Sequence, residues 1–190
     1  SKAIDKTGNG IVPAEGVAVV LLKKLSEAER DGDHIYAIIK GSTINQDGST
    51  NGITAPSAES QRNQEIDCYR NFGINPEEIS YVECHGTGTK LGDPIEIDAL
   101  TGSFNQFTSA KQFCAIGSVK TNIGHALSAA GVAGLIKVLM AMKHGQLTPS
   151  LHFNTPNEHI NFTDSPFYVN TALKEWKPVN GKRIAAISSF

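Results

Sequence analysis

The sequence has 190 residues, of which 39% are hydrophobic, enough to bury a core in one large domain or slightly more. Its 17 basic and 19 acidic residues give a net charge of −2 without a basic run, which argues against a nucleic-acid-binding surface. The longest apolar stretch is interrupted by Lys137 and by glycines, and we find no signal peptide. We therefore expect a cytoplasmic protein with no membrane span. Cys68, Cys84 and Cys114 are dispersed without metal-ligand spacing, as expected for reduced thiols.

The first 52 residues predict extended structure and loops. Residues 16–25 form a continuous apolar and β-branched run, which predicts a strand buried on both faces. A short polar helix at 26–30 and a second strand at 35–44 should follow, so that the two strands form a hairpin-like pair. Residues 45–52 are rich in turn-forming residues, and they form either a solvated connection or a loop over a substrate channel.

The rest of the chain alternates helices and strands, which implies a mostly parallel sheet with right-handed crossovers. Asp93 should cap one of the helices, with Pro94 at its first position. The last helix is rich in Ala and Gly and apolar over most of its circumference, so we expect a closely packed core helix. Prolines punctuate the surface segment that follows it, and Trp176 should anchor that segment to the body. Helices are expected at 57–72, 93–100 and 129–143, and strands at 79–84, 113–119, 167–169 and 184–187.

Two histidines occupy equivalent positions in this pattern. His85 and His125 each follow a predicted buried strand and each stand in a glycine-bearing loop before a helix. Because ligands bind at the carboxyl ends of parallel strands, we expect both at one edge of the sheet. Such a pair could bind a metal, act as acid and base, or donate two N–H bonds to a developing oxyanion. A metal is the least favoured of these because no third ligand has suitable spacing, and each could also be an ordinary buried histidine.

These two loops carry the most specific strings of the sequence. The first reads Cys84-His85-Gly86-Thr87-Gly88-Thr89 and continues to Gly92-Asp93-Pro94. The second reads Ser118-Val119-Lys120-Thr121-Asn122-Ile123-Gly124-His125 and continues to Ala129-Ala130-Gly131. Together with shorter segments at 5–16, 45–48 and 146–152, they resemble the β-ketoacyl synthase family, specifically the ketosynthase domain of modular type I polyketide synthases. The resemblance covers essentially the whole chain.

The resemblance implies an α/β, thiolase-like fold. Residues 1–54 would be the end of its amino-terminal half, contributing that repeat's last strands, and residues 55–190 would be its carboxyl-terminal half. It also implies decarboxylative Claisen condensation of an acyl and a malonyl thioester in polyketide elongation. Both substrates would arrive on the phosphopantetheine arm of acyl carrier protein, without a bound cofactor or metal, and the enzyme would be a homodimer.

The resemblance also assigns roles to residues. His85 and His125 would donate N–H bonds to the enolate oxygen that forms when carbon dioxide leaves, and one good donor contributes about 3 to 4 kcal/mol. Lys120 would support the second histidine electrostatically, or it would only form a structural salt bridge. The substrate-binding residues would be Thr87, Thr89 and Asn122, with the two threonines hydrogen-bonding the pantetheine arm.

The family nucleophile, a cysteine in a Thr-Ala-Cys-Ser-Ser-type turn, has no counterpart in this sequence. Cys84 adjoins His85, but neighbours on a strand face opposite sides of the sheet. Cys68 and Cys114 are expected to be packing residues. We therefore expect the carboxyl-terminal portion of a ketosynthase, truncated at both ends, that works with the rest of the domain and is inactive alone.

Two alternatives remain open at this point. The chain could be a non-elongating gatekeeping or scaffold domain, although its two histidines argue against that. It could also be a thiolase or a chain-initiating synthase, although the string ending at His125 favours elongation. Leu127 departs from the Glu or Gln that many modular ketosynthases carry there.

Overall fold

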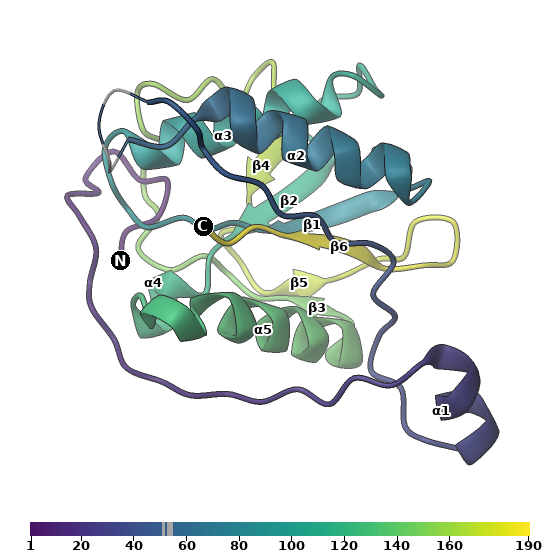
Figure 1. Cartoon of the computed structure of the whole chain (residues 1–190). Helices are drawn as coiled ribbons and strands as arrows, with labels where there is room; N and C mark the ends of the chain where they lie inside the picture. The colour runs from purple at the N-terminus through teal and green to yellow at the C-terminus, as the bar shows by residue number, and fades with distance from the viewer. Residues whose placement is uncertain (51, 53–54) are drawn as a thin grey trace.

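A four-stranded parallel sheet forms the centre of the molecule, as the alternating pattern predicts. The computed structural model describes residues 1–50, 52 and 55–190. One face of the sheet is covered by α2 (Ala58–Asn71) and α3 (Gly92–Phe104), and the other by α5 (Ala130–His144) (Figure 1). In spatial order, the strands are β4 (Phe167–Val169), β2 (Cys114–Gly117), β1 (Ile79–Glu83) and β6 (Ile184–Ile187).

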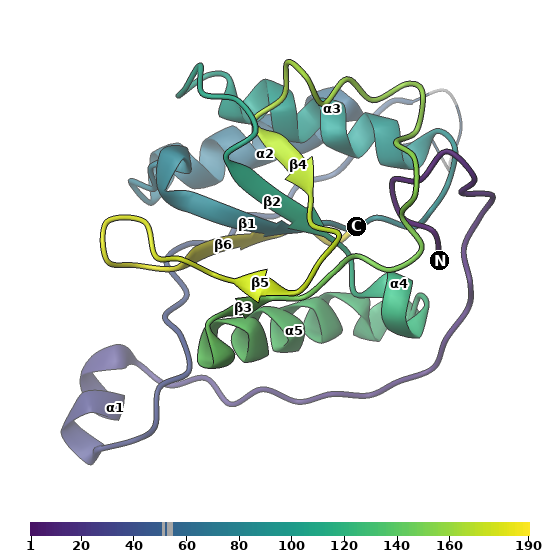
Figure 2. The ribbon, with the colours of Figure 1, turned by 180° about the vertical axis from the view of Figure 1, so that it is seen from behind.

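Shorter elements surround these layers. A two-stranded antiparallel sheet, which the sequence did not predict, lies beside α5 (Figure 2). Its strands are β3 (Gln146–Leu147) and β5 (Lys174–Glu175), and the remaining elements are α1 (Leu25–Asp31), α4 (Lys120–Ile123) and the 3₁₀ turns Pro76–Glu78 and Leu127–Ala129.

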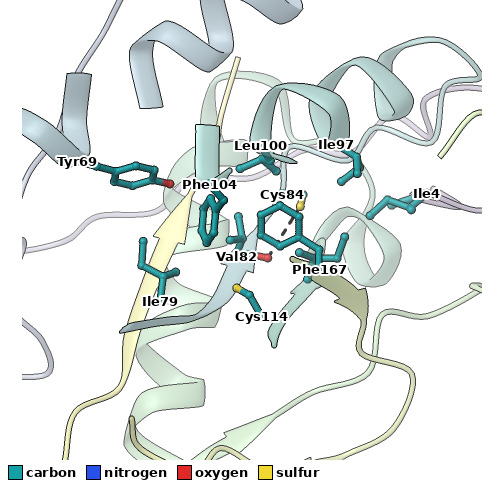
Figure 3. Packing of buried hydrophobic residues seen from close by; sticks show 12 residues of the cluster. Ile4, Tyr69, Ile79, Val82, Cys84, Ile97, Leu100, Phe104, Cys114 and Phe167 are labelled. Carbon is teal, nitrogen blue, oxygen red and sulfur yellow. Dashed lines mark hydrogen bonds between the residues drawn. The ribbon is translucent and has the colours of Figure 1, made fainter. Parts of the chain in front are cut away.

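The strand residues alternate between two cores, one on each face of the sheet. Val82, Cys84 and Cys114 point toward α3, where they pack with Phe104 and Phe167 (Figure 3). On the opposite face, Tyr81, Ala115 and Val138 pack with Trp176. The Trp176 ring is buried and its Nε1–H donates to Ser80 Oγ at 2.8 Å, so the predicted anchor is confirmed.

The prediction of strands at 16–25 and 35–44 is wrong. Both segments are extended, but neither is paired in a sheet, and Val17, Val19 and Leu21 are 92%, 88% and 96% exposed. The first segment passes along α5 to α1, which stands away from the body (Figure 1). An apolar β-branched run predicts extended backbone, but a strand also needs a neighbouring strand, and the described residues supply none here. Residue 51 of the 45–52 loop and residue 54, at the predicted boundary between halves, lie outside the described residues.

Helix α3 begins and ends differently from the prediction. It runs to Phe104, and its N-cap is Leu91, not Asp93. The Asp93 carboxylate instead accepts the backbone N–H groups of Ile4 at 2.6 Å and Gly88 at 3.0 Å. A carboxylate at the start of a helix can cap that helix or bind a neighbouring segment, because in both cases it accepts backbone N–H groups.

Helix α5 is less buried than predicted. Only one stripe of α5 is buried, at Ala130, Gly134, Val138 and Ala141, because the sheet covers a single face of the helix. Among the described residues, Leu127–His144 is the one segment long and apolar enough to cross a membrane by length and composition alone. That observation is weak evidence for a span, because Lys137 near its middle forms an ion pair within the fold.

Candidate active site

The two histidines lie together at the carboxyl edge of the sheet. His85 follows β1, and His125 follows β2 after the single turn of α4; the two strands are neighbours, with Glu83 opposite Gly117. The two ring centroids are 5.3 Å apart and the ring planes meet at 83°. The two histidines lie close together because each follows one of two neighbouring parallel strands, whose carboxyl ends meet at the same edge of the sheet.

Both imidazole rings are held by backbone donors at the same nitrogen. Nδ1 of His125 accepts the N–H of Leu127 at 3.0 Å, and Nδ1 of His85 accepts the N–H of Phe190 at 3.3 Å. A neutral imidazole that accepts at Nδ1 carries its hydrogen on Nε2. Each ring therefore has one remaining N–H donor, and the two donors belong to neighbouring rings.

The surroundings keep both rings neutral. Burial lowers the pKa of His85 to about 3, with Lys120 and His125 as further causes. Burial and the Lys120 charge also lower the pKa of His125. A proton on either Nδ1 would also face a backbone N–H donor. At neutral pH the pair therefore offers two uncharged N–H donors.

Lys120 lies in α4, not in a loop as predicted, and is 2% exposed. Burial lowers the pKa of its ammonium, while Glu96 and Glu83 act in the opposite direction. No carboxylate of the described residues lies within 4.0 Å of the Lys120 ammonium. The described residues therefore offer Lys120 no partner for the structural salt bridge considered above. Its charge acts on the histidines through space.

The backbone of His125 is paired with the amino-terminal segment of the chain. The N–H of His125 donates to Val12 O at 2.8 Å, and its carbonyl accepts from Ala14 at 3.0 Å. Gly124 before it has φ 81°, and a Cβ there would lie 2.8 Å from Val12 O. This close approach admits only glycine.

The backbone of His85 is held by a buried glutamate that the sequence analysis missed. Glu96 on α3 accepts the N–H groups of His85 at 2.6 Å and Gly86 at 2.8 Å. Burial raises the pKa of Glu96 to about 7, while these two hydrogen bonds oppose the rise. The available signal was an acidic residue three positions after Asp93, near the start of the helix that follows the His85 loop.

Comparison with known proteins decides the family. The model of the β-ketoacyl synthase C-terminal domain matches residues 36–154. The chain belongs to this family. Polyketide synthase PksL of Bacillus subtilis (strain 168) is 62% identical over 190 residues, which make up 100% of this chain and 4% of that protein. Polyketide synthase PksN of the same organism is 50% identical over 190 residues, again 100% of this chain and 4% of that protein.

Solved ketosynthases have the same fold. The ketosynthase from module 6 of the bacillaene synthase from Bacillus subtilis 168 matches with a TM-score of 0.98 at 62% identity. The match covers 100% of this chain and 34% of that one. The thiolase-like fold and the assignment to the carboxyl-terminal portion of a ketosynthase domain are thereby confirmed. The chain spans about a third of this solved ketosynthase.

The predicted substrate-binding residues of this ketosynthase segment lie in different settings. The hydroxyls of Thr87 and Thr89 are 3.3 Å apart, and Thr89 Oγ1 also accepts the N–H of Gly92 at 3.1 Å. They belong to the same loop as His85. Asn122 lies on the exposed face of α4. The structure therefore groups the threonines with the first histidine, whereas Asn122 faces outward.

Leu127 and Cys84 flank the histidines of the ketosynthase segment without adding a reactive group. Leu127 has φ 49°, a left-handed conformation that is uncommon outside glycine, and its side chain is 71% exposed. Its backbone N–H is the one that His125 accepts. Cys84 is buried in the core on the α3 side, where burial raises the pKa of its thiol. Among the described residues, no three His, Cys, Asp or Glu side chains gather as a metal site.

Proposed function

We propose that this chain supplies the decarboxylation half of a β-ketoacyl synthase that elongates polyketide chains. The single observation that carries the proposal is the pair of neutral imidazoles, His85 and His125, each held at Nδ1 and each with Nε2–H left to donate. Two adjacent uncharged donors suit an oxyanion that exists only during the reaction.

The proposed reaction begins when a malonyl thioester oxygen lies between the two Nε2–H groups. The bond between the malonyl carboxylate carbon and C2 breaks, carbon dioxide leaves, and the electron pair is delocalised onto the thioester oxygen as an enolate. Its C2 then attacks the carbonyl of an acyl thioester, a new carbon–carbon bond forms, and the acyl group's thiolate leaves. Lys120 would support His125 electrostatically and help to keep both rings neutral.

The substrates would arrive on the phosphopantetheine arm of acyl carrier protein. Thr87 and Thr89 are the proposed hydrogen-bonding partners of that arm, because their hydroxyls lie in the loop of the first histidine. Asn122 is a weaker candidate for the same task, given its position on the exposed face of α4. No further cofactor is part of this proposal.

The thiolate nucleophile belongs, in this proposal, to the rest of the ketosynthase domain. The sequence holds three cysteines, none in a Thr-Ala-Cys-Ser-Ser-type turn, and Cys84 and Cys114 are buried in the core. We therefore expect the 190 residues alone to be inactive. The complete domain is proposed to act as a homodimeric acyltransferase in the cytoplasm.

Substitution of His125 tests this function in a complete ketosynthase domain that contains the chain. His125→Ala should slow carbon dioxide release from malonyl acyl carrier protein by about 10²- to 10³-fold, the usual cost of losing one oxyanion donor. Acyl transfer to the enzyme should continue. His144→Ala, at the exposed end of α5, is the matched control. Unchanged carbon dioxide release in His125→Ala would overturn the proposal.

The same assay addresses the gatekeeping alternative. A gatekeeping domain would transfer acyl groups without releasing carbon dioxide, so the wild-type domain would be acylated but inactive toward malonyl acyl carrier protein. The preserved geometry of both histidines favours the elongating enzyme.

A further inference from the structure

A buried carboxylate joins the two histidine loops to α5. Glu83 is the last residue of β1, two positions before His85, and is 1% exposed. Its Oε1 accepts the backbone N–H of Val119 at 2.5 Å, and Val119 is the N-cap of α4. One side chain therefore spans from the first histidine strand to the turn that carries Lys120 and leads to His125.

The second oxygen of the same carboxylate is held from two further elements. Glu83 Oε2 accepts the Tyr81 hydroxyl at 2.7 Å and the Lys137 ammonium at 2.7 Å. Lys137 on α5 also donates to the Tyr81 hydroxyl at 2.9 Å. The three groups thus close a ring of hydrogen bonds, and the Lys137 charge compensates the buried Glu83 charge.

Two glycines leave room for this arrangement. A Cβ at Gly134 on α5 would lie 3.1 Å from Glu83 Cγ, and a Cβ at Gly117 on β2 would lie 3.0 Å from the Tyr81 hydroxyl. The Glu83 side chain therefore lies close against the backbone of α5, and three hydrogen bonds hold its carboxylate.

We propose that Glu83 is a positioning residue for decarboxylation, which fixes the α4 turn, and with it His125 and Lys120, relative to His85. The inference rests on the proposed function. Donation to a transition-state oxyanion depends on the separation of the two Nε2–H groups, and displacement of about 1 Å can cost about 10²-fold in rate. Transfer of the acyl group to the cysteine does not need this separation.

The decisive comparison is between two double variants of a complete ketosynthase domain. Glu83→Gln/Lys137→Met and Glu83→Met/Lys137→Met both remove the buried ion pair, so neither leaves an uncompensated charge. In the first, the Gln amide oxygen can still accept the Val119 N–H while its NH₂ group donates to the Tyr81 hydroxyl. In the second, the Met side chain offers Val119 no comparable acceptor and also loses the contact with the Tyr81 hydroxyl. The two doubles therefore differ in the hydrogen bonds from residue 83 to Val119 and to Tyr81, of which only the first reaches the α4 turn.

Carbon dioxide release and acylation of the enzyme are measured separately for each variant. We expect the Met/Met variant to release carbon dioxide about 10²-fold more slowly than the Gln/Met variant, with equal rates of acylation. Glu65→Gln, which alters a glutamate bonded to Ser103 between α2 and α3, is the control for loss of a carboxylate elsewhere. An equal fall in both activities, or no difference between the doubles, would overturn the inference.

Failure of this inference can be told apart from failure of the proposed function. If His125→Ala abolishes carbon dioxide release while the two doubles behave alike, Glu83 is only structural. If His125→Ala has no effect, the function itself is wrong. If the Met/Met variant does not fold, the single variant Glu83→Gln tests the inference instead. In this variant the new amide NH₂ group must point at another hydrogen-bond donor, either the Val119 N–H or the Lys137 ammonium. Its ratio of carbon dioxide release to acylation should then fall and recover when Lys137→Met is added; a ratio that stays unchanged would count against the inference.

Discussion

The imidazole rings of His85 and His125 meet nearly at right angles with centroids 5.3 Å apart, and each is held at Nδ1 by a backbone N–H. This arrangement defines both the tautomer and the charge of the pair. His85, Lys120, Glu96 and Glu83 maintain it, and each variant of these groups is best made in a complete ketosynthase domain that contains the chain.

The pH dependence of stability should report the neutral state of His85. Its pKa is about 3 in the folded chain and about 6.5 ordinarily, so between these values the unfolded chain binds a proton that the folded chain does not. The His85 contribution to the free energy of unfolding should therefore fall as the pH falls from 7 to 4, and His85→Asn should remove this contribution in urea unfolding series. Glu96 and Glu65, with pKa values raised to about 7 and about 8, act with the opposite sign in both proteins, so the difference between the two pH profiles isolates His85. Identical slopes would contradict the prediction.

Removal of the Lys120 charge should make both histidines easier to protonate. The lysine lowers the pKa of His85 and of His125, so Lys120→Met should raise both pKa values. Nitrogen chemical shifts of ¹⁵N-labelled histidine, followed through a pH titration, measure this directly. Lys111→Met, at an exposed lysine before the amino end of β2, should leave both pKa values in place. If Lys120→Met also leaves both pKa values unchanged, the Lys120 charge does not act on the two histidines.

Loss of the Glu96 carboxylate should destabilise the His85 loop. Glu96→Met would leave the backbone N–H groups of His85 and Gly86 without their acceptor, at about 1–3 kcal/mol for each buried donor. We expect a lower urea midpoint and slower carbon dioxide release. Glu77→Met, at an exposed glutamate, should change the free energy of unfolding by less than about 0.5 kcal/mol. Equal effects of the two substitutions would show that Glu96 does not hold the loop.

Two glycines in helices should respond differently to alanine. Replacement of an interior helical glycine by alanine gains about 1 kcal/mol where space allows. At Gly102 the neighbouring atoms belong to the flexible Arg62 side chain, so Gly102→Ala should raise the thermal midpoint. At Gly134 the new Cβ would meet Glu83, which three hydrogen bonds hold in place. Gly134→Ala should therefore bring no gain. A gain of the same size at both positions would argue against a rigid Glu83.

Local sequence patterns predicted the sheet and the position of the two histidines well. The strand before His85 and the strand before His125 are apolar runs bounded by turn residues, and parallel strand ends must meet at one edge. The same kind of run misled us at residues 16–25. Periodicity indicates extended backbone, but the partner of a strand is a property of the whole assembly, and the exposed Val17, Val19 and Leu21 find none among the described residues.

The supporting carboxylates were harder to predict. Asp93 lies in the first turn of α3, where an acidic residue is common, and it accepts backbone N–H groups whether it caps the helix or holds a loop. Glu96 lies three residues further along the same helix. Glu83 was visible only as an acidic residue inside an apolar strand. Which donors these side chains reach depends on segments up to 89 residues apart, as in the bond from Ile4 to Asp93.

The sequence by itself determined the family, the parallel sheet and the two histidines, because motif strings and hydrophobic patterns are properties of contiguous residues. Only the tertiary structure decided how the histidines are held: which nitrogen of each ring carries the hydrogen, which carboxylate holds each loop, and how Glu83 connects them. Those features arise from contacts between distant segments, and their directions follow from packing, which a linear pattern does not encode.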